Sequence, residues 1–191
     1  MNKESAKKFL FEVYDVLESI NLKPFLIGGT LLGAVRDKDF IEWDKDIDLG
    51  LVTDYFNNQD SFYELSKKLQ KIGARVETVW HDFMFRIVGD CPYHIDVAIH
   101  KKFDNEYRLE VFGNFARYIK ISLEALDTYD DIIFLNKNVR TPGNTGEYFK
   151  CLYGDDWKIP SEKFTIPIIK TRSYGKVRYT YIRPILDNND L

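Results

Sequence analysis

The chain has 191 residues, 45% of them apolar and 15% aromatic, and its 27 basic and 30 acidic residues leave a net charge of -3. This composition suits a folded domain with a sizeable core and excludes a disordered tail, and the near balance of charge predicts no nucleic-acid partner. Two cysteines, Cys91 and Cys151, are too few for a disulfide framework and predict reduced thiols in a cytoplasmic protein.

The first part of the chain predicts a helix, a buried strand, a glycine turn and a second helix. Apolar residues recur at helical spacing from Ala6 to Ile20, and the acidic residues among them argue against a secretory leader. A short strand is expected over residues 24–27, followed by the glycine pair 28–29 and a helix over residues 30–36. In residues 41–51 apolar and acidic positions alternate, which predicts a strand with one acidic face.

The rest of the chain continues to mix helices and strands. We expect a helix at 61–72, strands at 75–79, 83–88 and 93–99, a hairpin at 107–119 turning at Gly113–Asn114, a strand at 132–135 and a helix at 145–152. This order favours an α+β or α/β domain, a mixed sheet flanked by helices. Residues 163–184 carry six basic residues and no acidic one, so residues 161–191 are expected to be a basic, tyrosine-rich extension packing on a domain of residues 1–160.

Asp46 and Asp48 are the strongest candidates for chemistry. Two positions apart on a strand, their carboxylates leave the same face about 6–7 Å apart at their bases, and Asp44 extends the row. Such a cluster is costly without a cation, and oxygen ligands favour Mg2+ or Mn2+ over Zn2+. A solvated acidic strand end is the alternative, but the glycine pair upstream at a helix start favours a site.

That glycine pair is the second candidate feature. Gly28 and Gly29 let a backbone approach a phosphate closely, and the helix that follows offers N–H groups to an anion, although a glycine pair is also an ordinary tight turn. Arg36, at the end of that helix, can either reach a phosphate or pair with Asp37 or Asp39. The sequence leaves both alternatives open.

A third carboxylate, Asp96, lies in a strand whose other side is apolar. If this strand neighbours the strand of Asp46, Asp96 completes a triad that can bind a second metal ion and accept a proton from an attacking hydroxyl. The alternative is a surface aspartate on an edge strand. His94 and His100 lie on the same side of the strand and are expected to be solvated or hydrogen-bonded rather than metal ligands.

Residues 28–36 (GGTLLGAVR) and 40–50 (FIEWDKDIDLG) resemble the signature of the LicD family, which includes bacterial phosphocholine transferases and the fukutin-related protein. Residues 152–157 (LYGDDW), followed by Pro160, are similar to a second, weaker motif of the family, so the resemblance spans roughly residues 5–160. It implies the nucleotidyltransferase fold of the polymerase-beta type, with the glycine loop and the acidic strand side by side. Many family members are longer, and the basic tail matches no family motif.

By this resemblance, Asp46, Asp48 and Asp96 are the catalytic and metal-binding carboxylates. The residues expected to contact substrate are Gly28, Gly29, Thr30, Arg36, Asp44, Tyr153, Gly154 and Asp156. The implied enzyme uses Mg2+ or Mn2+ and transfers an alcohol phosphate from a CDP-linked donor, such as CDP-choline or CDP-ribitol, to a hydroxyl of a glycan, releasing CMP in cell-surface polysaccharide synthesis. A lipid-linked glycan as acceptor implies transient contact with a membrane surface.

Two other functions use the same fold. A nucleotidyltransferase would move NMP from an NTP to a small hydroxyl compound through the same carboxylates and release pyrophosphate. A non-catalytic binding module would retain the fold without turnover, an outcome that the intact Asp46, Asp48 and Asp96 argue against.

Overall fold

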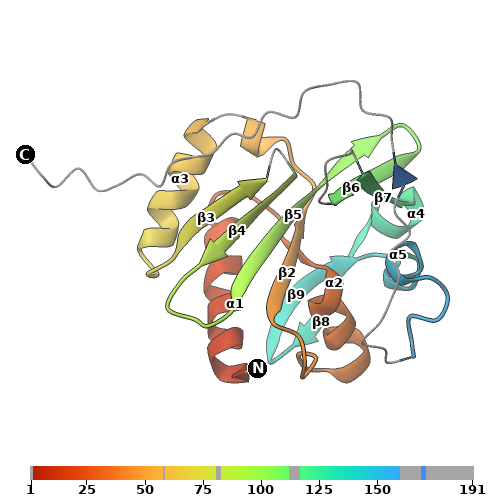
Figure 1. Cartoon of the computed structure of the whole chain (residues 1–191), viewed down its shortest axis with the longest axis horizontal. Helices are drawn as coiled ribbons and strands as arrows, with labels where there is room; N and C mark the ends of the chain where they lie inside the picture. Colours follow the sequence, from red (N-terminus) through yellow and green to blue (C-terminus); the bar gives the residue numbers. More distant parts are fainter. Residues whose placement is uncertain (1, 58, 81–82, 112–116, 160–168, 171–191) are drawn as a thin grey trace, which may run out of the picture.

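The computed structural model describes residues 2–57, 59–80, 83–111, 117–159 and 169–170 (Figure 1). The helices are α1 (Lys3–Glu18), α2 (Gly28–Leu32), the π-helical turn η1 (Gly33–Asp37), η2 (Tyr55–Asn57), α3 (Gln59–Gln70), α4 (Leu123–Leu126) and α5 (Thr145–Tyr153). The strands are β1 (Phe25–Leu26), β2 (Asp46–Leu51), β3 (Arg75–Trp80), β4 (Met84–Val88), β5 (His94–Phe103), β6 (Glu106–Val111), β7 (Arg117–Ile121), β8 (Tyr129–Phe134), β9 (Lys137–Pro142) and β10 (Ile169–Lys170).

Within the described residues, a mixed sheet of eight strands forms the centre of the fold. Its order is β1-β2-β5-β6-β7-β10, with β4 also paired to β5 and β3 to β4. The β2–β5 pair is parallel, while β5 is antiparallel to β4 and to β6. Mixed helices and strands around this sheet confirm the predicted fold class.

The two faces of the sheet are covered by different elements. Alternate residues of β5 point to opposite faces, so Val97 and His100 lie on different sides of it. On the Val97 side, Phe85 of β4 contacts the ring of Phe62 in α3. On the His100 side, His100 contacts Phe25 of β1 and Tyr148 of α5. Phe25, His100 and Tyr148 are all buried. The carboxylates of β2 and β5 lie on the His100 side.

Several element boundaries differ from the prediction for local reasons. The expected strand over residues 41–51 begins only at Asp46, because a turn in which the Asp44 N–H donates to the Ile41 carbonyl at 3.2 Å precedes it. Strand β9 was not predicted; it pairs with β8 through a tight turn in which Leu135 and Asn136 both have positive φ.

The tip of the predicted hairpin, residues 112–116, lies outside the described residues. So does most of the predicted basic extension, residues 161–191, of which only β10 is described; it pairs antiparallel with β7. In the described part of the chain, no helix combines the length and the apolar character that crossing a membrane requires.

Candidate active site

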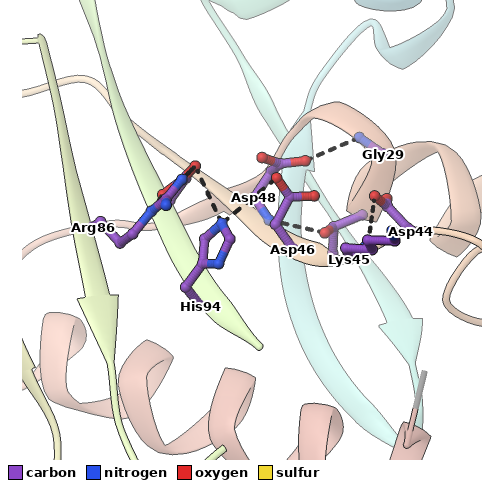
Figure 2. Close-up of polar contacts among 9 residues, drawn as sticks. Gly29, Asp44, Lys45, Asp46, Asp48, Arg86 and His94 are labelled. Atoms are coloured by element: carbon purple, nitrogen blue, oxygen red, sulfur yellow. Dashed lines mark hydrogen bonds and ion pairs between the residues drawn. The ribbon is translucent and has the colours of Figure 1, made fainter. Parts of the chain in front are cut away.

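The parallel pairing of β2 and β5 brings the predicted carboxylates together. Asp48 lies directly opposite Asp96 in the register of the two strands. Asp46 lies opposite His94 (Figure 2). Because paired positions of neighbouring strands point to the same face, the side chains of both strands converge on one spot. The structure therefore satisfies the condition under which Asp96 joins Asp46 and Asp48.

The acidic cluster is electrostatically unfavourable when it is fully ionised. Asp44, Asp46 and Asp48 each place a carboxylate oxygen within 4.8 Å of the others. Burial, reinforced by the neighbouring Asp46, raises the pKa of Asp44 to about 6. Burial and the charges of Asp46, Asp44 and Asp96 raise the pKa of Asp48 well above its usual range. A bound cation would relieve this repulsion.

The glycine pair lets the start of α2 come against these carboxylates. A Cβ on Gly28 would lie 2.4 Å from Asp48 Oδ2, and a Cβ on Gly29 would lie 2.1 Å from Asp44 Oδ2. The Gly29 N–H donates to Asp48 Oδ2 at 3.1 Å (Figure 2). Thr30 is buried, and its hydroxyl accepts the Asp48 N–H at 2.9 Å. Gly28, Gly29 and Thr30 thus hold the aspartates in place, a role that sequence reasoning missed. Their contact with phosphate remains a prediction.

Arg86, which sequence reasoning also missed, binds Asp96. Its Nε donates to Asp96 Oδ1 at 2.7 Å and its Nη2 donates to Asp96 Oδ2 at 2.9 Å. The antiparallel register of β4 and β5 places the two residues opposite each other. A signal was available in the sequence: an aspartate between Ile95 and Val97 needs a buried counter-charge, and Arg86 is the basic residue of the preceding strand.

The two histidines of β5 have different environments. His94 Nε2 lies 3.8 Å from Asp46 Oδ2 and 3.8 Å from Asp96 Oδ2, and this buried nitrogen has no hydrogen-bond partner among the described residues. His100 is deeply buried, and its Nε2 is 2.9 Å from the Tyr148 hydroxyl. Burial lowers the pKa of His100 to about 4, which keeps the ring neutral.

The remaining predicted substrate residues are Arg36, Tyr153, Gly154 and Asp156. Arg36 binds both oxygens of Asp37 at 2.7 Å, one of the two alternatives left open by the sequence. Tyr153, at the end of α5, lies near enough to Asp48, Asp44 and Arg36 for their charges to act on its pKa, which burial raises. Gly154 ends that helix with φ 83°, and Asp156 is exposed.

The donor set fits a divalent cation. Two groups of possible ligands share Asp46: one is the all-oxygen set Asp44–Asp46–Asp48, and the other is Asp46–His94–Asp96. The raised pKa values of Asp44 and Asp48 reflect a repulsion that a cation on the all-oxygen set would relieve. His94 Nε2, which has no hydrogen-bond partner among the described residues, belongs to the other set. Carboxylate oxygens are the donors that Mg2+ and Mn2+ prefer.

Two curated human proteins are similar in sequence to parts of this chain. Human ribitol-5-phosphate transferase FKTN is 26% identical over 165 residues, which cover 83% of this chain and 34% of the human protein. Human ribitol 5-phosphate transferase FKRP is 46% identical over 46 residues, 24% of this chain and 9% of that protein. The chain thus spans about a third or less of the length of the curated relatives it matches.

A solved structure supports the fold. The lincosamide antibiotic adenylyltransferase LnuA, solved with lincomycin bound, superposes with a TM-score of 0.50 at 14% identity, covering 73% of this chain and 82% of LnuA. This likeness confirms a nucleotidyltransferase-like fold. The model of one family, "LicD/FKTN/FKRP, nucleotidyltransferase domain", matches residues 21–144, well over half of the chain. The chain therefore belongs to the LicD/FKTN/FKRP nucleotidyltransferase domain family.

Proposed function

We propose that this domain transfers an alcohol phosphate, such as phosphocholine or a polyol phosphate, from a CDP-linked donor to a hydroxyl of a glycan or lipid-linked glycan. The observation that carries the proposal is the convergence of Asp46, Asp48 and Asp96 on one face of two adjacent parallel strands. Membership of the LicD/FKTN/FKRP family and the likeness to two ribitol-phosphate transferases support an alcohol phosphate as the transferred group.

In the proposed reaction, the acceptor hydroxyl attacks the distal phosphorus of the donor. A new oxygen–phosphorus bond forms, the bond from that phosphorus to the bridging oxygen breaks, and CMP leaves with the electron pair. Asp96 accepts the hydroxyl proton. Asp46 and Asp48 would hold a divalent cation, Mg2+ or Mn2+, which when bound offsets the negative charge of the donor phosphates. Gly28 and Gly29 let the start of α2 lie against these carboxylates, and the donor phosphates would bind beside it.

The test is CMP release from CDP-choline and CDP-ribitol in the presence of Mg2+ and a glycan acceptor. We expect Asp46→Asn and Asp48→Asn each to lower turnover at least about 100-fold, because each removes a charge that holds the cation. Asp104→Asn, an exposed aspartate in the β5–β6 turn, is the matched control and should remain active. A chelator should stop the wild-type reaction, and added Mg2+ should restore it.

Two results would contradict this proposal. Near wild-type turnover by either variant would remove the carboxylates from the active site. Pyrophosphate release from an NTP, without CMP release from any CDP-linked alcohol, would instead favour a nucleotidyltransferase.

A further inference from the structure

Arg86 and Asp96 form a two-pronged ion pair inside the acidic site. Both oxygens of Asp96 accept from the guanidinium, at 2.7 Å from Nε and 2.9 Å from Nη2. The Asp96 side chain is only 9% exposed and that of Arg86 27% exposed, so water screens the pair weakly. A planar guanidinium bound in this manner is a fixed positive charge.

This fixed charge distinguishes Asp96 from the other acidic residues of the site. Asp96 already faces a cation across both of its oxygens. Asp44 and Asp48, in contrast, accept backbone N–H groups, from Lys45 and Gly29, each at 3.1 Å. A divalent ion on Asp96 would lie close to the guanidinium and be repelled by it, whereas an ion held by Asp46 and Asp48 would not share a carboxylate with Arg86.

The ion pair between Arg86 and Asp96 affects cation binding by the candidate ligand set that includes His94. His94 Nε2 lies 3.8 Å from an oxygen of Asp46 and 3.8 Å from an oxygen of Asp96, so the three residues form a second group of candidate ligands. That group depends on Asp96, and Asp96 is the partner of Arg86. If two neighbouring ions shared Asp46, the second would be the one bound by His94 and Asp96. The charge of Arg86 therefore disfavours this second ion.

We propose that Arg86 takes the place of a second divalent cation, so that this site binds one ion, at Asp46 and Asp48. The inference rests on the proposed function only in taking the acidic cluster to be a cation-binding active site. It narrows the prediction from the sequence, in which Asp96 also holds a metal ion. Arg86 is then a positioning residue, which holds Asp96 at the edge of the site as a carboxylate rather than as a metal ligand.

The experiment counts the Mn2+ ions bound per chain at saturation, from the electron paramagnetic resonance signal of free Mn2+. It is run with CDP present, and a titration of CDP without protein is subtracted. We expect one ion for the wild type, and one for Arg86→Lys, which keeps the charge. Arg86→Met and Arg86→Gln remove the charge and should each bind two ions. Arg75→Met, an exposed arginine of β3, is the control and should bind one.

The outcomes separate this inference from the proposed function. Any wild-type count other than one, or a count of one in a neutral Arg86 variant with a wild-type circular dichroism spectrum, overturns the inference. If neither neutral variant folds, the wild-type and Arg86→Lys counts still decide it, because two ions in either contradict it. One bound ion without CMP release would count against the proposed function alone.

Discussion

Gly28 and Gly73 share a left-handed backbone, with φ of +55° and +70°, but their surroundings differ. Among the described residues, a Cβ on Gly73 would meet only Asp90 Oδ2, at 3.8 Å. A Cβ on Gly28 would lie 2.4 Å from Asp48 Oδ2 and 2.8 Å from its Cγ. We expect both alanine variants to lose about 1 kcal/mol of unfolding free energy from backbone strain. Gly28→Ala alone should also displace Asp48.

Activity distinguishes the two variants. Gly28→Ala should lower CMP release at least about 10-fold, because Asp48 can no longer keep its place beside the start of α2, while Gly73→Ala should remain near wild type. Urea unfolding and the CMP assay on both proteins give the comparison. Equal activity of the two variants would mean that the position of Asp48 is not critical.

The positions of single residues were predictable where they depend on a local pattern, while their catalytic roles remain predictions. Asp46 and Asp48 follow from alternation along one strand, and Asp96 from the apolar residues on either side of it. Arg86 was missed because its role depends on the register of β4 against β5, which spacing within either segment does not contain. Thr30 was predicted as a substrate contact, and its support of the Asp48 N–H depends on the packing of α2 against β2.

At the scale of elements, α5 is held on the sheet partly by a buried polar contact. The Tyr148 hydroxyl lies 2.9 Å from His100 Nε2, and both residues are almost completely buried. Tyr148→Phe leaves that ring nitrogen without its partner in an apolar setting. We expect a loss of about 1–3 kcal/mol of unfolding free energy.

Tyr63→Phe is the matched control, because Tyr63 of α3 is 48% exposed. It should change the free energy of unfolding by less than about 0.5 kcal/mol. Thermal melts of the two variants, followed by circular dichroism, give the comparison. Equal melting temperatures would show that the contact between His100 and Tyr148 does not stabilise the fold.

Elements with strong periodicity were predicted well, and those set by tertiary context were not. Helix α1 and strand β5 follow from their apolar spacing. Strand β9 was missed because its polar sequence, KNVRTP, carries little alternation, although Asn136 beside it is a turn signal. The expected helix over residues 30–36 starts earlier, at Gly28, and changes to a π-helical turn at Gly33, where a Cβ would lie 2.4 Å from the Asp39 carbonyl oxygen.

At the scale of the whole molecule, an apolar core supports an acidic site that carries excess negative charge. The core side chains pack into one cluster across both faces of the sheet. The carboxylates of β2 and β5 are therefore held by a rigid framework, and their repulsion cannot be relieved by local rearrangement alone. Part of the stability of the metal-free protein should thus depend on pH.

Asp44 and His100 make opposite contributions to the pH dependence of stability in acid. The pKa of Asp44 is about 6 in the folded chain, against an ordinary value of 3.8. The folded state therefore binds more protons than the unfolded state between these two pH values, so stability falls as pH rises. The pKa of His100, about 4 against 6.5, means that the unfolded state binds more protons there, so stability rises with pH. Between about pH 4 and 6 the two effects oppose each other.

Asp44→Asn should remove the contribution of Asp44 to the pH dependence of stability and leave that of His100. In a chelator, we expect the variant and the wild type to be equally stable near pH 4, where Asp44 is protonated in the folded state. By pH 7 the variant should be more stable by about 1 kcal/mol, a value discounted because Asp44 is partly exposed. Urea unfolding at both pH values measures the difference, with Asp104→Asn as the control. Saturating Mg2+ should reverse the sign of this difference at pH 7, because the ionised Asp44 carboxylate lies within 4.8 Å of the carboxylate oxygens that would hold the cation. If Mg2+ left the difference unchanged, the charge of Asp44 would not act on the cation.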